Sequence, residues 1–136
     1  MTVVAAALVD GAGRVLLQRR APGRAMAGLW EFPGGKVEAD ELPEAALVRE
    51  LREELGIEVD AAALSPACFA SAPVGGRHMI LLLYLCRLWR GEPRPLDASA
   101  LQWALPAEMR GLAMPPADVP LIVLLEALLQ GAQPLR

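Results

Sequence analysis

The sequence has few aromatic residues and no excess of positive charge. Phenylalanine, tyrosine and tryptophan make up 4% of its 136 residues, and the formal net charge is -3. Proteins that bind single-stranded nucleic acid combine a basic groove with aromatic side chains on which the bases stack, and no such stripe is present. We therefore expect no nucleic-acid polymer as a partner. An anionic ligand has to be bound locally, through a cation or a few arginines.

Cysteines and long apolar runs are also scarce. Cys68 and Cys86 are too far apart in the sequence for a CxxC site, so we expect two small buried hydrophobic residues in a reducing compartment. The apolar run at residues 3–9 has no basic residue before it and ends at Asp10. It is short for a signal peptide and far short of a membrane span. These features predict a cytoplasmic protein with no membrane partner.

The length and composition fit one globular domain. Hydrophobic residues make up 54% of the chain and charged residues 21%, which excludes a disordered chain. A domain near this size buries roughly 68% of the surface that its unfolded chain exposes, enough for a real core. No internal repeat, low-complexity segment or linker is present. We predict a single domain over residues 1–136.

The chain is expected to begin with strands. Residues 3–9 and 14–19 are strand-like, and the Asp-Gly-Ala-Gly cluster at residues 10–13 between them is typical of a hairpin turn. Residues 79–88 predict a long buried strand, although their leucine content leaves a helix open. Glycine and prolines at residues 91–95 end that segment.

A loop and a helix follow the first strands. Glycines and prolines between residues 21 and 35 predict a loop, with one short extended piece at residues 30–32. Residues 43–55 predict a helix, because almost all of them are good helix formers. Pro43 suits the first helical position, and Gly56 suits the left-handed residue just past the end.

The last segment is also expected to be helical. Residues 119–130 are flanked by Asp118, a good N-cap, and by Gly131, and residues 107–109 predict a short helical turn. The run at residues 121–125 is apolar on all sides, so this helix is either buried or faces a second copy. A monomer and a homodimer both remain open. The mixture of strands and helices predicts an α+β fold.

Three carboxylates share one face of the predicted helix 43–55. Spacings of three and four residues place Glu50, Glu53 and Glu54 within one arc of about 100°, next to the apolar face that a core requires. Like charges at this spacing repel, and a hard divalent cation between them would remove the repulsion. Such a cluster alone can equally be a solvated surface, so the surrounding residues have to decide.

The surrounding run is highly specific. Between residues 35 and 57 it places Gly35, Glu41, Arg49, Glu50, Leu51, Glu53, Glu54, Gly56 and Ile57 at fixed separations. Seven fixed residues plus two aliphatic positions would arise by chance in such a chain with a probability on the order of 10^-7. The run resembles the Nudix box of the Nudix hydrolase superfamily without a mismatch.

This resemblance implies a fold and a cofactor. The fold is a loop-helix-loop packed on a mixed β-sheet, within an αβα sandwich. Glu50, Glu53 and Glu54 would bind Mg2+ or Mn2+, and Gly34 and Gly35 would let the backbone turn tightly so that a carbonyl also faces the metal. Arg49 is placed to pair with Glu53 at i+4. The cation would neutralise the pyrophosphate and activate the water that attacks phosphorus.

The likeness continues beyond the box over nearly the whole chain, to MutT-type 8-oxo-dGTP diphosphatases and related CTP pyrophosphohydrolases. Residues 29–36 resemble the MutT approach to the box. The substrate-binding residues that this likeness implies are Arg20, Glu31, Phe32, Lys36 and Arg77. His78 follows in the same Arg-His pair at the start of the next long strand, where a strand-end residue is the simpler interpretation.

Two aspartates differ from the MutT pattern. Asp97 lies where the family brings a further carboxylate toward the metals, usually glutamate, and its shorter side chain leaves a metal ligand, a general base or a solvated loop acid open. Asp118 lies in the base-reading corner, where MutT has asparagine and the CTP-type relatives have aspartate. An ionised aspartate only accepts hydrogen bonds, so it suits the cytosine N4 amino group and opposes O6 of 8-oxoguanine unless it is protonated. Asp118 can also be simply the helix N-cap.

The resemblance predicts a Mg2+-dependent enzyme that converts a nucleoside triphosphate to its monophosphate and pyrophosphate by water attack at the β phosphorus. The first hypothesis is 8-oxo-dGTP hydrolysis in nucleotide-pool sanitation, and the alternative is hydrolysis of CTP or 5-hydroxy-dCTP. A third hypothesis, a nucleotide-binding module without catalysis, is disfavoured because all the box glutamates are present.

Overall fold

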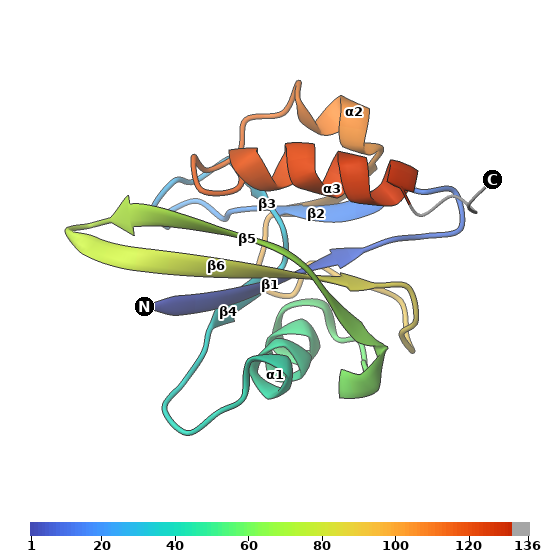
Figure 1. Cartoon of the computed structure of the whole chain (residues 1–136), viewed down its shortest axis with the longest axis horizontal. Coiled ribbons are helices and arrows are strands. Elements are labelled where there is room, and N and C mark those ends of the chain that lie inside the picture. Colours follow the sequence, from blue (N-terminus) through green and yellow to red (C-terminus); the bar gives the residue numbers. More distant parts are fainter. Residues whose placement is uncertain (132–136) are drawn as a thin grey trace.

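The computed structural model describes residues 1–131, which form seven strands, three α-helices and a short 3-10 helix (Figure 1). In chain order they are β1 Thr2–Leu8, β2 Val15–Arg19, β3 Trp30–Glu31, β4 Gly34–Lys36, α1 Pro43–Leu55, η1 Ala61–Ala63, β5 Leu64–Val74, β6 Arg77–Cys86, β7 Ala100–Ala104, α2 Pro106–Met109 and α3 Val119–Gly131. The predicted domain extends to residue 136, and its last five residues lie outside the described part.

The strands form two sheets. The larger sheet has the order β4-β1-β6-β5, with β1 parallel to β6 and the other neighbours antiparallel. The smaller sheet has the order β3-β2-β7 and is antiparallel. Helix α1 lies on one side of the larger sheet and α3 on the other, as Figure 1 shows. The predicted α+β sandwich with a mixed sheet between helices is therefore confirmed.

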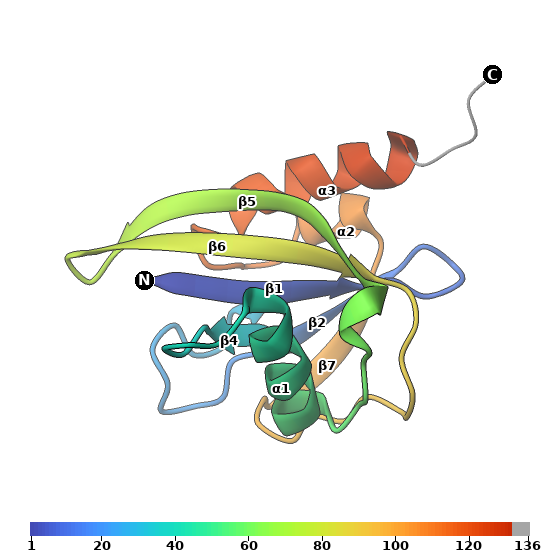
Figure 2. The same ribbon diagram turned by 60° about the horizontal axis from the view of Figure 1, so that its bottom comes forward.

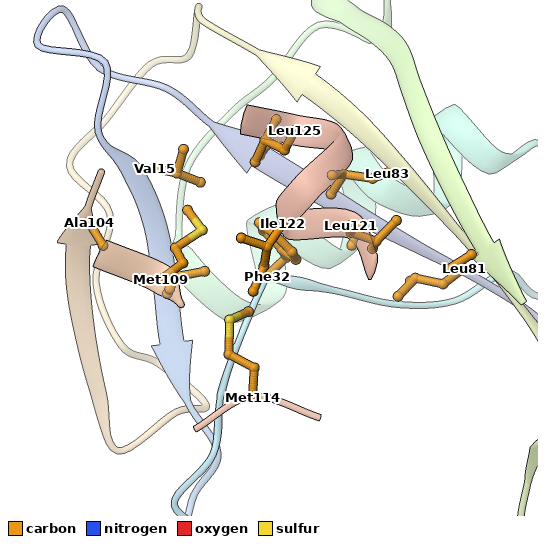
Figure 3. Close-up of a cluster of buried hydrophobic side chains, with 14 of the residues drawn as sticks. Val15, Phe32, Leu81, Leu83, Ala104, Met109, Met114, Leu121, Ile122 and Leu125 are labelled. Carbon is orange, nitrogen blue, oxygen red and sulfur yellow. The ribbon is translucent and has the colours of Figure 1, made fainter. Parts of the chain in front are cut away.

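Strand β1 lies in the middle of the larger sheet and contributes to two cores. Successive side chains of a strand point to opposite faces, so alternate β1 residues pack on different helices. Val4, Ala6 and Leu8 join Leu47, Leu51 and Leu55 of α1 in one cluster. Ala5 and Ala7 join Leu121, Ile122 and Leu125 of α3 in the other, part of which is shown in Figure 3. Because both faces are covered, the strand is apolar from Val3 to Leu8.

Helix α1 has the predicted bounds and ends. Pro43 occupies its first turn, where a missing N–H costs nothing. Gly56 follows in the left-handed conformation, with φ 71°, and its N–H donates to the Arg52 carbonyl. The helix orientation relative to the sheet is set by its buried face, which includes Leu47, Leu51 and Leu55.

The predicted last helix is present as α3. Leu121, Ile122 and Leu125 are buried, whereas Val123 and Leu124 are 55% and 46% exposed, so one face packs and the other does not. The helix continues to Gly131, so this glycine is the last helical residue rather than the one after it. Such a difference of one residue is common at helix ends.

Some strands were not expected from the sequence. The predicted loop at residues 21–35 is wrong at its end, because β4 pairs with β1 there. Strand β5 contains Pro66 and Pro73, and it exists as an edge strand paired with β6, a position that tolerates proline. Strand β7 pairs with β2. These pairings join segments far apart in the sequence, which local patterns do not report.

The remaining sequence expectations concern the β6 strand, the cysteines and membrane spans. Residues 77–86 form a strand, so the helix alternative is excluded, and Figure 2 shows β5 and β6 as one long hairpin beside β1. Cys86 is buried and Cys68 half-buried, both free, as predicted for small hydrophobic residues. Within residues 1–131, no helix has the length and apolar character that a membrane crossing requires.

Candidate active site

A cavity of about 690 Å³ is lined by α1, β4, the loop after β2, the β5–β6 hairpin and residues 115–118 just before α3. Most of the residues that the box and its flanks predicted to be functional meet here. The charged side chains that line it are Arg20, Arg24, Lys36, Glu31, Glu50, Glu53, Glu54, Asp97 and Asp118. Among the described residues the lining thus carries three basic side chains and six carboxyl groups. A polyphosphate would therefore bind tightly in this cavity only with additional positive charge.

Glu54 is the most deeply buried carboxyl group of α1, with 8% of its surface exposed. Gln18 Nε2 donates to Glu54 Oε1 at 2.7 Å, and the Gly34 N–H donates to Glu54 Oε2 at 3.0 Å. Burial, together with the charges of neighbouring Glu50 and Glu31, raises the pKa of Glu54 to about 8, although the hydrogen bonds from Gln18 and Gly34 lower it. These two hydrogen bonds hold the carboxyl group at the junction of α1, β2 and β4.

Arg49 organises the other two α1 carboxylates without lining the cavity itself. Its Nε and NH2 atoms both donate to Glu41 at 2.9 Å, and this pairing lowers the pKa of Glu41 to about 2. NH1 donates to Glu50 at 2.8 Å and lies 3.5 Å from Glu53. The predicted pair with Glu53 is present, but Glu41 and Glu50 are the closer partners. Burial raises the pKa of Glu50.

Gly34 and Gly35 have a different physical role from the predicted tight turn. Both lie in the extended strand β4, and neither has a positive φ. A Cβ atom on Gly34 would lie 2.0 Å from the Val4 carbonyl oxygen, and one on Gly35 would lie 2.4 Å from Cδ of Glu50. The tight-turn expectation is therefore wrong. Glycine is required here because the strand approaches β1 and a carboxylate closely.

The donor set fits a hard divalent cation. Glu50, Glu53 and Glu54 supply carboxylate oxygens to one cavity, and the contact of Glu50 with Gly35 forms a cradle that any larger residue would fill. Within residues 1–131 no three acidic, histidine or cysteine side chains converge on one point. Glu50 and Glu53 are instead directed toward Arg49, so binding a cation would require them to turn.

Two ion pairs lie at the other side of the cavity. Arg20 NH1 contacts both carboxylate oxygens of Glu31, at 2.7 and 3.2 Å, and its Nε donates to the Ala25 carbonyl. Arg24 NH2 donates to Asp97 Oδ1 at 2.6 Å. Burial raises the pKa of Glu31 despite its arginine partner. The family-like residues Arg20, Glu31 and Asp97 are thus brought together, and Arg24 joins them.

Asp118 lies at the inner wall of the cavity, 7% exposed, beside Phe32. The Phe32 ring packs in the core near Leu121 and Ile122, as Figure 3 shows, and its backbone N–H faces the Asp118 carboxyl group. Burial raises the pKa of Asp118 to about 7, with Glu31 as a further cause. The Leu121 N–H donates to the backbone carbonyl of Asp118. This carboxyl group is therefore part of the cavity wall.

Two residues of the family likeness lie outside the cavity, and two residues that the sequence did not predict lie in it. Arg77 is exposed at the tip of the β5–β6 hairpin and is not among the residues lining the cavity. His78 is exposed in β6, where its carbonyl accepts from the amino terminus. Sequence reasoning missed Gln18 and Arg24. A polar residue within the apolar run of β2 was the one available signal for Gln18; nothing marked Arg24.

Four carboxyl groups with raised pKa values in one cavity are typical of a functional site. The sequence pattern of the NUDIX domain matches residues 1–125. The chain is 40% identical over 134 residues to the CTP pyrophosphohydrolase of Escherichia coli (strain K12), covering 98% of this chain and 97% of the relative. It is 37% identical over 114 residues to the 8-oxo-dGTP diphosphatase of the same organism, covering 84% and 87%.

Solved structures agree with this similarity. The solution structure of the E. coli ORF135 protein has a TM-score of 0.85 and 39% identity, covering 99% of this chain and 94% of the other. The crystal structure of a MutT NUDIX hydrolase from Burkholderia pseudomallei has a TM-score of 0.76 and 32% identity, covering 92% and 95%.

Proposed function

This chain belongs to the NUDIX domain family and is a Nudix hydrolase acting on phosphoric anhydrides, and we propose that its substrate is a nucleoside triphosphate, which it cuts to the monophosphate and pyrophosphate with Mg2+. The observation that carries this proposal is the charge of the cavity. Six carboxyl groups face three basic side chains in a space that must accept a polyphosphate. A divalent cation would offset this excess of negative charge and strengthen the binding of the polyphosphate.

We assign the residues of the Nudix box to binding that cation. We assign Glu50, Glu53 and Glu54 as its ligands, with the Gly34 carbonyl and Asp97 as further oxygen donors. Mg2+ or Mn2+ bound there would neutralise charge on the phosphates and lower the pKa of a coordinated water. Arg49 is a positioning residue, because it contacts two of the carboxylates and does not line the cavity.

The side chains of the other wall bind the nucleotide. Arg20 and Lys36 line the cavity and are assigned to the phosphates, where arginine forms strong charge-assisted hydrogen bonds. Glu31, Phe32 and Asp118 surround the position of the base, with the Phe32 backbone beside the Asp118 carboxyl group. Arg77 is assigned to substrate binding by family likeness alone, and its exposed position gives it no support.

The first candidate substrate is 8-oxo-dGTP. Its O6 accepts hydrogen bonds, so an ionised Asp118 would oppose it and a protonated Asp118 would donate to it. Burial raises the pKa of Asp118 to about 7, which makes the protonated form available near neutral pH. The 8-oxo-dGTP diphosphatase among the relatives supports this candidate. Removal of oxidised nucleotides in the cytoplasm is the cellular role that we propose with it.

The second candidate substrate is CTP or 5-hydroxy-dCTP. The cytosine N4 amino group donates hydrogen bonds and therefore suits an ionised Asp118, which predominates above pH 7. The relative that matches almost the whole chain is named a CTP pyrophosphohydrolase. The two candidates differ in the protonation state of one carboxyl group.

The deciding experiment is to measure, by chromatography of the products, the hydrolysis of 8-oxo-dGTP, dGTP, CTP, 5-hydroxy-dCTP, ADP-ribose and diadenosine polyphosphates, with Mg2+ and with EDTA. Metal-dependent hydrolysis with the highest kcat/KM on 8-oxo-dGTP supports the first candidate, and the highest value on cytosine nucleotides supports the second. Preference for ADP-ribose or a dinucleotide contradicts the triphosphate proposal. Nucleotide binding without turnover would indicate a binding module.

A further inference from the structure

Arg24 has no counterpart among the residues that the family likeness assigns to the substrate, yet its side chain lines the cavity. It lies in the loop after β2, which is tied to the cavity by the bond from Arg20 Nε to the Ala25 carbonyl. Its guanidinium group donates to Asp97 at 2.6 Å. Both Arg24 and Asp97 affect the pKa of Glu31 through their charges, so the pair lies close to the acidic floor of the cavity.

We propose that Arg24 binds the phosphate chain of the substrate, and that Asp97 holds its guanidinium group in the free protein. This inference rests on the proposed triphosphate substrate. Binding would then be an exchange, in which phosphate oxygens replace the Asp97 carboxylate as acceptors from Arg24. No covalent bond changes in this step.

The accessibility of the pair favours such an exchange. The side chains of Arg24 and Asp97 are 56% and 43% exposed. Ion pairs at exposed positions contribute little to stability, so breaking this one costs little. A polyphosphate offers more negative charge and more acceptor oxygens than one carboxylate, and the planar guanidinium group suits such acceptors.

The other basic side chains of the cavity do not make Arg24 redundant. Arg20 is 29% exposed and is held by both oxygens of Glu31 and by the Ala25 carbonyl, so it is a fixed group. Lys36 is a single point charge at the end of β4. Among the residues that the structure describes, Arg24 is the cavity arginine that has a single carboxylate partner, Asp97, and this pair is exposed to solvent.

The test measures the Kd of inorganic tripolyphosphate for the metal-free protein in EDTA. NMR chemical shifts recorded during a titration at low salt give this Kd. Arg24→Gln should raise the Kd about tenfold, the loss of roughly one strong charge-assisted contact. Asp97→Asn should lower the Kd about threefold, because it frees Arg24 from an exposed ion pair. In the double variant the gain from Asp97→Asn should vanish, because it acts only through Arg24.

Arg90→Gln and Asp60→Asn are matched controls. Arg90 and Asp60 form an exposed ion pair at 3.3 Å, and neither lines the cavity. The two substitutions remove the same charges as Arg24→Gln and Asp97→Asn. Both variants should leave the Kd unchanged. The proposal would be overturned if Asp97→Asn lowered the Kd equally in the wild-type and Arg24→Gln backgrounds. It would also be overturned if the Asp97→Asn variant showed no measurable binding. This readout needs neither turnover nor a nucleobase, so it is independent of whether the substrate assay succeeds.

Discussion

The wall of the cavity made by α1 and β4 differs in construction from the wall made by residues 20–32, Asp97 and residues 115–118 just before α3. In the first wall, carboxylates from one helix are clamped by Arg49, which both oxygens of Glu41 hold in place. In the second, groups far apart in the sequence meet in pairs, such as the side chains of Arg24 and Asp97, and the Phe32 backbone N–H with the Asp118 carboxyl group. We refer to them as the box wall and the base wall.

The two walls therefore separate hydrolysis from the choice of substrate. The box wall presents oxygen ligands that any phosphoric anhydride could use, whatever its base. The base wall presents groups whose hydrogen-bonding character depends on one aspartate and its protonation. Substitutions in the box wall should therefore change kcat for all substrates alike, and substitutions in the base wall should change their ranking.

The largest expected effect is that of Glu53→Gln. This side chain is 60% exposed, so its loss should not disturb folding, but it removes a proposed cation ligand. We expect kcat to fall by on the order of 10³ for every substrate. Steady-state kinetics at saturating Mg2+, with Tm as a folding check, measures this. Glu58→Gln, an exposed carboxylate outside the cavity, is the control, and intact turnover in Glu53→Gln would contradict the metal site.

Arg49→Lys is expected to have the next largest effect. Lysine cannot donate to both Glu41 oxygens and also to Glu50, so the carboxylates of the box wall lose their common anchor. We expect kcat to fall about 10-fold to 100-fold and Mn2+ to bind more weakly, as for other residues that orient ligands. Both are measured directly, by kinetics and by EPR titration.

Arg52→Lys is the matched control for this prediction. Arg52 lies in the same helix and donates to both oxygens of Glu58, at 2.9 and 2.8 Å, outside the cavity. It should retain wild-type Mn2+ affinity. Equal losses in the two variants would show that the helix, rather than the box wall, was damaged.

In the base wall, Asp118 should couple substrate ranking to pH. Because burial raises its pKa to about 7, the ratio of kcat/KM for CTP to that for 8-oxo-dGTP should rise as the pH increases through 7. Asp118→Asn should make the ratio independent of pH in this range and favour 8-oxo-dGTP by about tenfold. A pH profile of both substrates for both proteins measures this. An unchanged ranking in Asp118→Asn would leave Asp118 a structural residue alone.

The smallest expected effect concerns stability. The pKa of Asp118 is about 7 in the folded chain and 3.8, its ordinary value, in the unfolded chain, so the folded chain binds this proton more tightly. The contribution of this proton to the free energy of unfolding is therefore complete below pH 3.8 and is lost as the pH rises through 7. We expect wild type to lose about 1 kcal/mol more than Asp118→Asn between pH 4.5 and 8, because the carboxyl group borders an open cavity. Urea unfolding across this range measures it, with Asp60→Asn as control. Parallel curves would contradict the raised pKa.

The same two walls differ in how far the sequence predicts them. The box wall was predicted almost entirely, because α1 is a local structure and helical spacing alone places Glu50, Glu53 and Glu54. The reason for Gly34 and Gly35 was wrong, since their requirement comes from the neighbouring strand and a carboxylate rather than from a turn. Spacing reports periodicity, and it does not report what another segment brings into contact.

The base wall was predicted only where family likeness named a residue. Arg24 and Asp97 are 73 residues apart, so no local pattern connects them. The same limit applies to one contact of the box wall, because Gln18 and Glu54 are 36 residues apart. Strands β5 and β7 were missed for the same reason, because each exists through pairing with a distant partner. One face of α3 is apolar and exposed, and the sequence prediction of either a monomer or a homodimer stays a prediction.

The alternation of β1 between two cores has a consequence for substitutions in this strand. Ala6 packs in the core beneath α1, and Ala7 packs in the core beneath α3. Adjacent residues of this strand therefore have different neighbours, one the helix that carries the box carboxylates and the other the helix that follows Asp118. Two neighbouring positions of one strand are thereby fitted to two separate parts of the molecule, so enlarging Ala6 would press on α1 and enlarging Ala7 would press on α3.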